Sequence, residues 1–163
     1  MIGGVLGAAF KSSPFQGAVF YVKSIIATPI HERTRMTRTN SKIIHPELSY
    51  ELNGIFFQAH RELGRFCNER QYCDLIEKLL IENKMLYKRE FELSDFCGPK
   101  GNRVDFLIEN EIIVDVKAKK FITKDDYIQM LRYLECANLE LGMIVNFRST
   151  YLKPKRVLNS KLK

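Results

Sequence analysis

Two aspartates and a lysine lie on either side of a short polar turn in the second half of the chain. Asp105 precedes the turn Glu109-Asn110-Glu111, and Asp115 and Lys117 follow it. The flanking residues are rich in valine, isoleucine and phenylalanine, a composition typical of a β-hairpin. With Asn110 central in the turn, Asp105 would lie roughly opposite Asp115, and side-chain alternation would place Lys117 on the same face.

These residue types indicate a particular chemistry. Two carboxylates on paired strands would lie about 5 Å apart and would repel each other unless a cation lay between them. A hard divalent cation with a preference for oxygen, Mg²⁺ or Mn²⁺, would relieve that repulsion. Such an ion polarises a phosphoryl oxygen and activates a bound water, while Lys117 could orient that water or neutralise developing charge. The trio favours hydrolysis of a phosphodiester, although Asp and Lys two residues apart also occur as a solvated pair on the polar face of a sheet.

Two helices are predicted before the hairpin. Apolar residues at spacings of three and four predict a first helix from Pro46 to near Gly64. Asn68 is a suitable N-cap for a second helix that ends near Asn83. Glu69 falls in the first turn of this second helix, where a carboxylate also interacts favourably with the helix dipole.

The remaining segments complete a mixed α/β pattern. Met85–Leu93 predicts a strand, and Cys97–Asn102 is a turn cluster that leads into the hairpin. Thr123, followed by two aspartates, predicts the start of a third helix, and the apolar segment Leu141–Phe147 predicts a strand covered on both faces. We expect Lys153–Lys163 to be solvated and frayed. The order α-α-β-β-β-α-β predicts an α/β fold, a small mixed β-sheet flanked by helices.

Length and composition favour one globular domain with appended ends, because 45% of the 163 residues are hydrophobic. We expect the folded domain in residues 45–157 and a basic tail in residues 158–163. Residues 1–44 predict an N-terminal extension that is disordered or that precedes the true start, for which Met36 is a candidate. Their acid-poor composition with Arg, Ser and Thr also resembles a transit peptide. No apolar run in the chain approaches the roughly 18 residues of a membrane span.

The net charge of +7 comes from the two ends of the chain. Residues 1–46 and residues 153–163 each carry a net charge of +5, whereas residues 47–152 carry 15 basic and 18 acidic residues. This distribution permits a nucleic-acid partner without demonstrating one.

The cysteines favour a protein without a zinc site or a disulfide framework. Cys67, Cys73, Cys97 and Cys136 form no CxxC pair and no Cys/His cluster with zinc spacing. We therefore expect reduced thiols and a cytoplasmic location.

Together these motifs resemble the PD-(D/E)XK nuclease superfamily. Asp105 resembles its first acidic position, Asp115-Val116-Lys117 its (D/E)xK element, and Gln129-x-x-x-Tyr133 the QxxxY element of the branch with recombination-repair exonucleases. The resemblance to small bacterial proteins named after a GxxExxY motif is closer still and covers about residues 45–157. It includes the segments HPELSY (45–50) and HRELG (60–64), Glu69, Tyr72, Tyr133-Leu134 and Asn146-Phe147. It implies a restriction-endonuclease-like core.

The motif departs from that pattern at one position. Phe66 stands where the GxxExxY pattern has glycine, and Cys67-Asn68 follow instead of the usual apolar pair. Either the turn before the second helix is rebuilt, or the phenyl ring narrows the pocket beside Glu69.

The resemblance implies a role for each candidate residue. Asp105, Asp115 and Glu69 would be metal ligands for Mg²⁺ or Mn²⁺, and Lys117 would hold or activate the attacking water. Gln129 would point toward Lys117 or a phosphate. Tyr133 would support that face, although core packing explains it equally well. Arg103 and Lys119 could contact phosphates of nucleic acid, and His60 is expected to be a helix-surface residue rather than a ligand.

Three functions follow as hypotheses. The first is a metal-dependent nuclease that hydrolyses DNA. The second is a catalytically inactive nucleic-acid-binding or regulatory module on the same fold. The third is a partner-binding protein, with a possible homodimer formed through the helix that contains residues 48–63.

Overall fold

The structure is a computed structural model that describes residues 43–93 and 103–162. The predicted N-terminal extension, the candidate start Met36, and the turn cluster Cys97–Asn102 lie outside the described residues.

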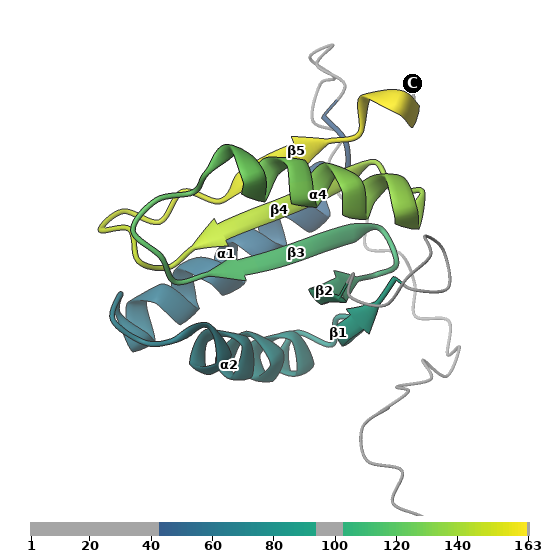
Figure 1. The fold of residues 1–163 in the computed structure, drawn as a ribbon. Helices are drawn as coiled ribbons and strands as arrows, with labels where there is room; N and C mark the ends of the chain where they lie inside the picture. The colour runs from purple at the N-terminus through teal and green to yellow at the C-terminus, as the bar shows by residue number, and fades with distance from the viewer. Residues whose placement is uncertain (1–42, 94–102, 163) are drawn as a thin grey trace, which may run out of the picture. The chain divides into compact units, whose positions relative to one another are not determined.

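The described residues form three α-helices and a five-stranded mixed sheet, which confirms the predicted α/β fold (Figure 1). The strand order is β1-β2-β3-β4-β5. Strands β3 and β4 pair in parallel, connected by helix α4, and the other neighbouring strands pair antiparallel. The elements are α1 (Pro46–Leu63), α2 (Glu69–Glu82), β1 (Tyr87–Glu92), β2 (Arg103–Ile108), β3 (Ile112–Lys117), α4 (Lys124–Ala137), β4 (Leu141–Asn146), β5 (Lys155–Leu158) and the 3₁₀ helix Ser160–Leu162.

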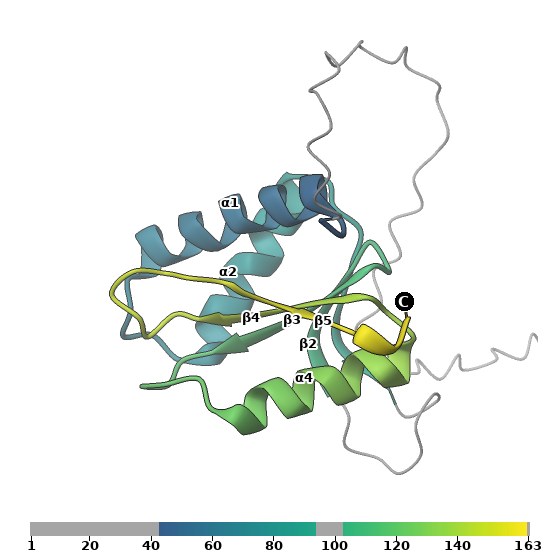
Figure 2. The same ribbon diagram turned by 90° about the horizontal axis from the view of Figure 1, so that it is seen from above.

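The sheet lies between two helical layers, with α1 and α2 on one face and α4 on the other (Figure 2). Alternate residues of β3 therefore enter different hydrophobic cores: Val114 and Val116 pack with α1 and α2, whereas Ile113 packs with α4. By the same alternation, Asp115 and Lys117 face α4. The helical contributions to the cores are Leu52, Ile55, Phe56, Ala59, Tyr72, Ile76, Leu79 and Leu80 on one face and Met130, Tyr133 and Leu134 on the other.

Local capping interactions fix where α2 and α4 begin. Asn68 and Gln71 form a capping box, in which each side chain accepts the other residue's backbone N–H, at 2.9 and 3.0 Å. At α4, the Asp126 carboxylate accepts the backbone N–H of Thr123 at 2.6 Å and its hydroxyl at 2.9 Å. Both caps stand at the residues that the sequence predicts, and they set the ends of the helices that border the candidate site.

The C-terminal segment differs from the frayed tail that we expected. Strand β5 pairs antiparallel with β4, and its Val157 is only 7% exposed. Arg156 donates hydrogen bonds to the Ser49 hydroxyl and the Ile44 carbonyl oxygen at the start of α1. The apolar strand β4 needs a partner on this edge, and that long-range requirement outweighs the basic composition of the segment.

The expectation of reduced thiols is wrong at one cysteine. Cys136 is disulfide-bonded, whereas Cys67 and Cys73 are free thiols. Pairing depends on which residues the fold brings within bonding range, which sequence spacing does not reveal. Among residues 43–93 and 103–162, no helix has the length and apolar character needed to cross a membrane.

Candidate active site

The central hairpin has the predicted register. Phe106 pairs with Val114 and Ile108 with Ile112, so the turn is centred on Asn110. Glu109 and Asn110 both have positive φ angles, of 50° and 56°, which suits a tight turn between strands. Asp105 and Asp115 therefore lie at the far end of the hairpin, away from the turn.

At this end of the hairpin, the side chain of Asp105 takes the place of a backbone hydrogen bond between β2 and β3. Its Oδ2 accepts the backbone N–H of Val116 at 2.7 Å, one step beyond the last β2–β3 pair. Val104 and Phe106 belong to different cores, so the regular alternation of β2 breaks at Asp105. The carboxylate consequently borders a hollow on the α2 side of the sheet.

The two aspartates approach from different sides of β3. Asp115 is affected electrostatically by Asp126 and Tyr133 of α4, whereas Asp105 is affected by Glu69 of α2. They are still close enough for the charge of Asp105 to contribute to raising the pKa of Asp115. This arrangement differs from the side-by-side placement that we expected, because the break in β2 turns Asp105 away from the α4 face.

Asp115 and Lys117 form an ion pair that is largely shielded from solvent. Lys117 Nζ lies 2.9 Å from Asp115 Oδ1, and Asp115 is only 6% exposed. Burial raises the pKa of Asp115 to about 6, even though Lys117 acts in the opposite direction. Burial also opposes the charge of Lys117, but Asp115, Asp105 and Glu69 outweigh it and raise the pKa of the ammonium. The lysine is therefore held in its protonated form among three carboxylates.

Asp105 is a second carboxylate whose charge is disfavoured. Burial raises its pKa; the hydrogen bond from Val116 and the charge of Lys117 counteract this, and Glu69 and Glu90 add to it. Asp115 is buried and Asp105 is half-buried, and both have raised pKa values beside one lysine. They leave negative charge that this lysine does not fully compensate.

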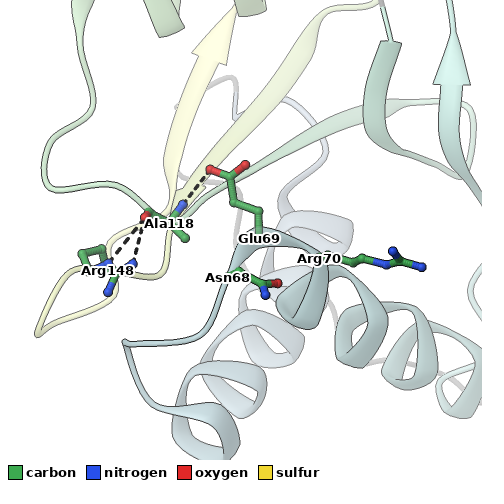
Figure 3. A pocket seen from close by; sticks show the side chains of 5 residues that line it. All are labelled: Asn68, Glu69, Arg70, Ala118 and Arg148. Atoms are coloured by element: carbon green, nitrogen blue, oxygen red, sulfur yellow. Dashed lines mark hydrogen bonds between the residues drawn. The ribbon is translucent and has the colours of Figure 1, made fainter.

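Glu69 reaches the same strand end from the first turn of α2. Its Oε1 accepts the backbone N–H of Ala118 at 2.9 Å, directly after Lys117 (Figure 3). Ala118 is also contacted through its carbonyl oxygen by Arg148, at 3.3 Å from Nη2 and 3.4 Å from Nε. An open hollow of about 410 Å³ is lined by Asn68, Glu69, Arg70, Ala118 and Arg148.

Sequence reasoning missed Glu90 and Arg148. Glu90 lies on β1 opposite Asp105, between the pairs Arg89–Phe106 and Phe91–Val104, and has a positive φ of 50°. It shares a hollow of about 500 Å³ with Glu69, Arg70, Cys73, Arg89 and Asp105. The register of β1 against the hairpin was the signal that could have found Glu90, and the sequence carried no comparable signal for Arg148.

Gln129 and Tyr133 lie together on α4. Gln129 Nε2 donates a 2.6 Å hydrogen bond to the Tyr133 hydroxyl, and Tyr133 is only 3% exposed. Burial, and next the charge of Asp115, raise the pKa of Tyr133, which places its hydroxyl within electrostatic range of that carboxylate. The structure thus brings both α4 residues to the face on which Asp115 and Lys117 lie.

Lys119 and Arg103 each have a protein partner. Lys119 Nζ lies 2.6 Å from the Asp126 carboxylate, and its backbone is held by the buried side chain of Asn146, which donates to its carbonyl oxygen at 2.7 Å and accepts from its N–H at 3.2 Å. Arg103 forms an exposed ion pair with Glu90 at 3.3 Å. A phosphate would have to compete with these carboxylates for either cation.

Tyr72 and Phe66, from the motif region, have different environments. Tyr72 is fully buried, stacks on Phe147 with ring centroids 4.3 Å apart, and donates to the Gly64 carbonyl oxygen at 2.8 Å. Phe66 is 74% exposed and is absent from the residues that line the hollow beside Glu69. The phenyl ring therefore points outward and does not narrow the pocket beside Glu69. His60 is half-buried, with Nε2 3.0 Å from the Ser149 carbonyl oxygen.

The donor set suits a hard divalent cation in type and charge. Asp105, Asp115 and Glu69 offer carboxylate oxygens, the ligands that Mg²⁺ and Mn²⁺ prefer, and a cation would compensate the charges of the buried Asp115 and the half-buried Asp105. In the described part of the chain, no three His, Cys, Asp or Glu side chains already lie in a metal-holding group. Lys117 supplies a positive charge 2.9 Å from Asp115.

Comparisons with known proteins give one match. The model of the PD-(D/E)XK nuclease superfamily matches residues 46–157, which include every element from α1 to β4 and most of β5. No curated protein and no solved structure matches the chain.

Proposed function

The chain belongs to the PD-(D/E)XK nuclease superfamily, and we propose that it is a metal-dependent nuclease that hydrolyses phosphodiester bonds of DNA. The observation that carries this proposal is the strand end where the Asp115–Lys117 pair, Asp105 and Glu69 converge around residues 116–118. Oxygen ligands for a hard cation and an ammonium group are components that can support metal-dependent phosphodiester hydrolysis.

We assign Asp105, Asp115 and Glu69 to holding Mg²⁺ or Mn²⁺. When bound, such an ion supplies a Lewis acid for a phosphoryl oxygen and lowers the pKa of water. Lys117, protonated and 18% exposed, would hold the attacking water and stabilise negative charge that develops on the phosphate.

The α4 residues and nearby cations would orient the substrate. Gln129 would act from α4 toward Lys117 or a phosphate, with Tyr133 fixing its amide through their 2.6 Å hydrogen bond. Arg103 and Lys119 are proposed to contact flanking phosphates of DNA after exchanging their present carboxylate partners.

The proposal is tested by incubating the purified protein with Mg²⁺ or Mn²⁺ and with linear, single-stranded and branched DNA. We expect metal-dependent cleavage that Lys117→Ala abolishes. Lys78→Ala is the matched control, because Lys78 is exposed on α2 and pairs only with Glu82 among the described residues. Cleavage that persists in Lys117→Ala would contradict the assignment. Salt-dependent DNA binding without cleavage would favour the inactive binding module instead.

A further inference from the structure

We propose that Phe66, flanked by the guanidinium groups of Arg65 and Arg148, is a stacking site for an unpaired base of single-stranded DNA. This inference rests on the proposed function, because it specifies the form of DNA that the same site would receive. It concerns binding alone, so it can be tested separately from cleavage.

The first observation is the exposure of the phenyl ring. Phe66 is 74% exposed in the segment between α1 and α2, where no core packing accounts for it. The Arg65 guanidinium carbon lies 4.9 Å from the ring centroid and that of Arg148 lies 5.8 Å from it. Both guanidinium groups lie over the ring, yet Phe66 remains 74% exposed, so an entering base would stack on the ring in place of a guanidinium group. The arginines would then pair with the phosphates of that strand.

The second observation is that this segment is anchored at both ends. Arg65 donates from Nη1 to the Thr150 hydroxyl, which connects the segment to the loop after β4. On the other side, the buried Tyr72 hydroxyl bonds the Gly64 carbonyl oxygen and accepts the Cys67 N–H at 3.3 Å. Because the backbone is held on both sides of Phe66, the ring would be presented with little ordering cost on binding.

The third observation is the position of the ring relative to the candidate active site. The Arg148 guanidinium group lies over the Phe66 ring. It also donates to the carbonyl oxygen of Ala118, the residue that follows Lys117 and whose N–H bonds Glu69 (Figure 3). One guanidinium group therefore links Phe66 to the strand end. A nucleotide stacked on the ring would place its backbone near Arg148, on the path to the proposed scissile phosphate.

Stacking on Phe66 selects for single strands. In a duplex, both faces of each base are covered by neighbouring base pairs, so a surface phenyl ring has no base face to contact without unstacking. In a single strand the faces are available, and any base can use the ring. The arginines alone would bind single and double strands through phosphates.

The test measures the fluorescence anisotropy of labelled oligo-dT and of a labelled duplex, in EDTA at low salt. We expect Phe66→Ala and Phe66→Leu to weaken oligo-dT binding about five- to 150-fold, the range of one stacked base, and to leave duplex binding unchanged. Phe66→Trp should bind oligo-dT at least as tightly as the wild type. Leucine keeps an apolar side chain without an aromatic face, so it separates stacking from hydrophobic contact.

Tyr50→Ala is the matched control, because Tyr50 is an exposed aromatic residue, 81% accessible, near the opposite end of α1. It should bind oligo-dT like the wild type. Wild-type affinity in Phe66→Leu, or an equal loss for duplex and oligo-dT, would overturn the stacking site. Because EDTA removes divalent metal, this failure is distinct from a failure of the proposed nuclease, which shows only as absent metal-dependent cleavage.

Discussion

Asp105 accepts a 2.7 Å hydrogen bond from the backbone N–H of Val116, the residue between Asp115 and Lys117. A side chain of β2 thus occupies the position that a strand carbonyl would take if the hairpin pairing continued. The backbone of β3, between Asp115 and Lys117, therefore holds the Asp105 carboxylate in place.

Replacing Asp105 separates this backbone role from its charge. Asp105→Asn retains an oxygen that can accept the Val116 N–H and removes a charge that burial disfavours, so we expect stability at least equal to that of the wild type. Asp105→Ala removes the acceptor and should lower the free energy of unfolding by about 1–2 kcal/mol. Chemical denaturation of both variants checks the difference. Equal stability of the Asn and Ala variants would show that the hydrogen bond contributes little.

Asp115→Asn should stabilise the metal-free protein at pH 7. The folded-state pKa of about 6 exceeds the ordinary value of 3.8, so the folded form binds more protons between those pH values and loses stability as pH rises through them. This difference between the folded and ordinary pKa corresponds to about 3 kcal/mol of stability, which the neutral amide would recover. The gain should be largest above pH 6 and should disappear below about pH 4. Denaturation in EDTA across pH 3.5–7.5 measures it, and a destabilised variant at pH 7 would contradict the effect of burial.

Asp126→Asn should have the opposite pH dependence. Burial acts to raise the pKa of Asp126, but hydrogen bonds from Lys119 and Thr123 outweigh it and lower that pKa. The carboxylate therefore contributes stability above its unfolded-state pKa, and this contribution is lost as pH falls through the folded-state pKa. We expect a loss of about 1–2 kcal/mol at pH 7, because the α4 cap and the Lys119 pair weaken together. The loss should shrink in acid. Asp125→Asn, in the same turn but exposed, is the control.

Tyr72→Phe should reduce stability without impairing cleavage. The variant retains the stack on Phe147 but loses the hydroxyl that bonds Gly64 and Cys67, which should cost about 1–2 kcal/mol. Thermal unfolding and a cleavage assay well below the melting temperature check the two parts. A fall in the cleavage rate of the folded variant would mean that the tyrosine acts in the site and does not merely join α1 to α2.

Local signals in the sequence were enough for most of the fold. Asn68 and Thr123 predicted the starts of α2 and α4, and the polar turn at Asn110 set the hairpin register, because capping and turn formation involve only near neighbours. Strand β5 was missed because its pairing with β4 depends on contacts that are distant in the sequence. Its Lys and Arg residues also hide the buried Val157.

The candidate site was predicted less completely than the fold. Residue types and register brought Asp105, Asp115, Lys117 and Glu69 to one strand end. The face of the sheet on which Asp105 lies depends on an irregular pairing of β1 with β2, in which Glu90 has a positive φ angle. The regular alternation of side chains along a strand does not predict this irregularity. The direction of Phe66 was equally open, because replacing a glycine leaves both an inward and an outward ring compatible with the sequence.

The central claim is that the carboxylates at this strand end bind a divalent cation, and calorimetric titration with Mn²⁺ tests it most directly. We expect saturable binding to the wild type, and none to Asp115→Asn at the same concentrations, while circular dichroism shows both proteins folded. Equal Mn²⁺ binding by wild type and variant, or no binding by the folded wild type, would contradict the claim.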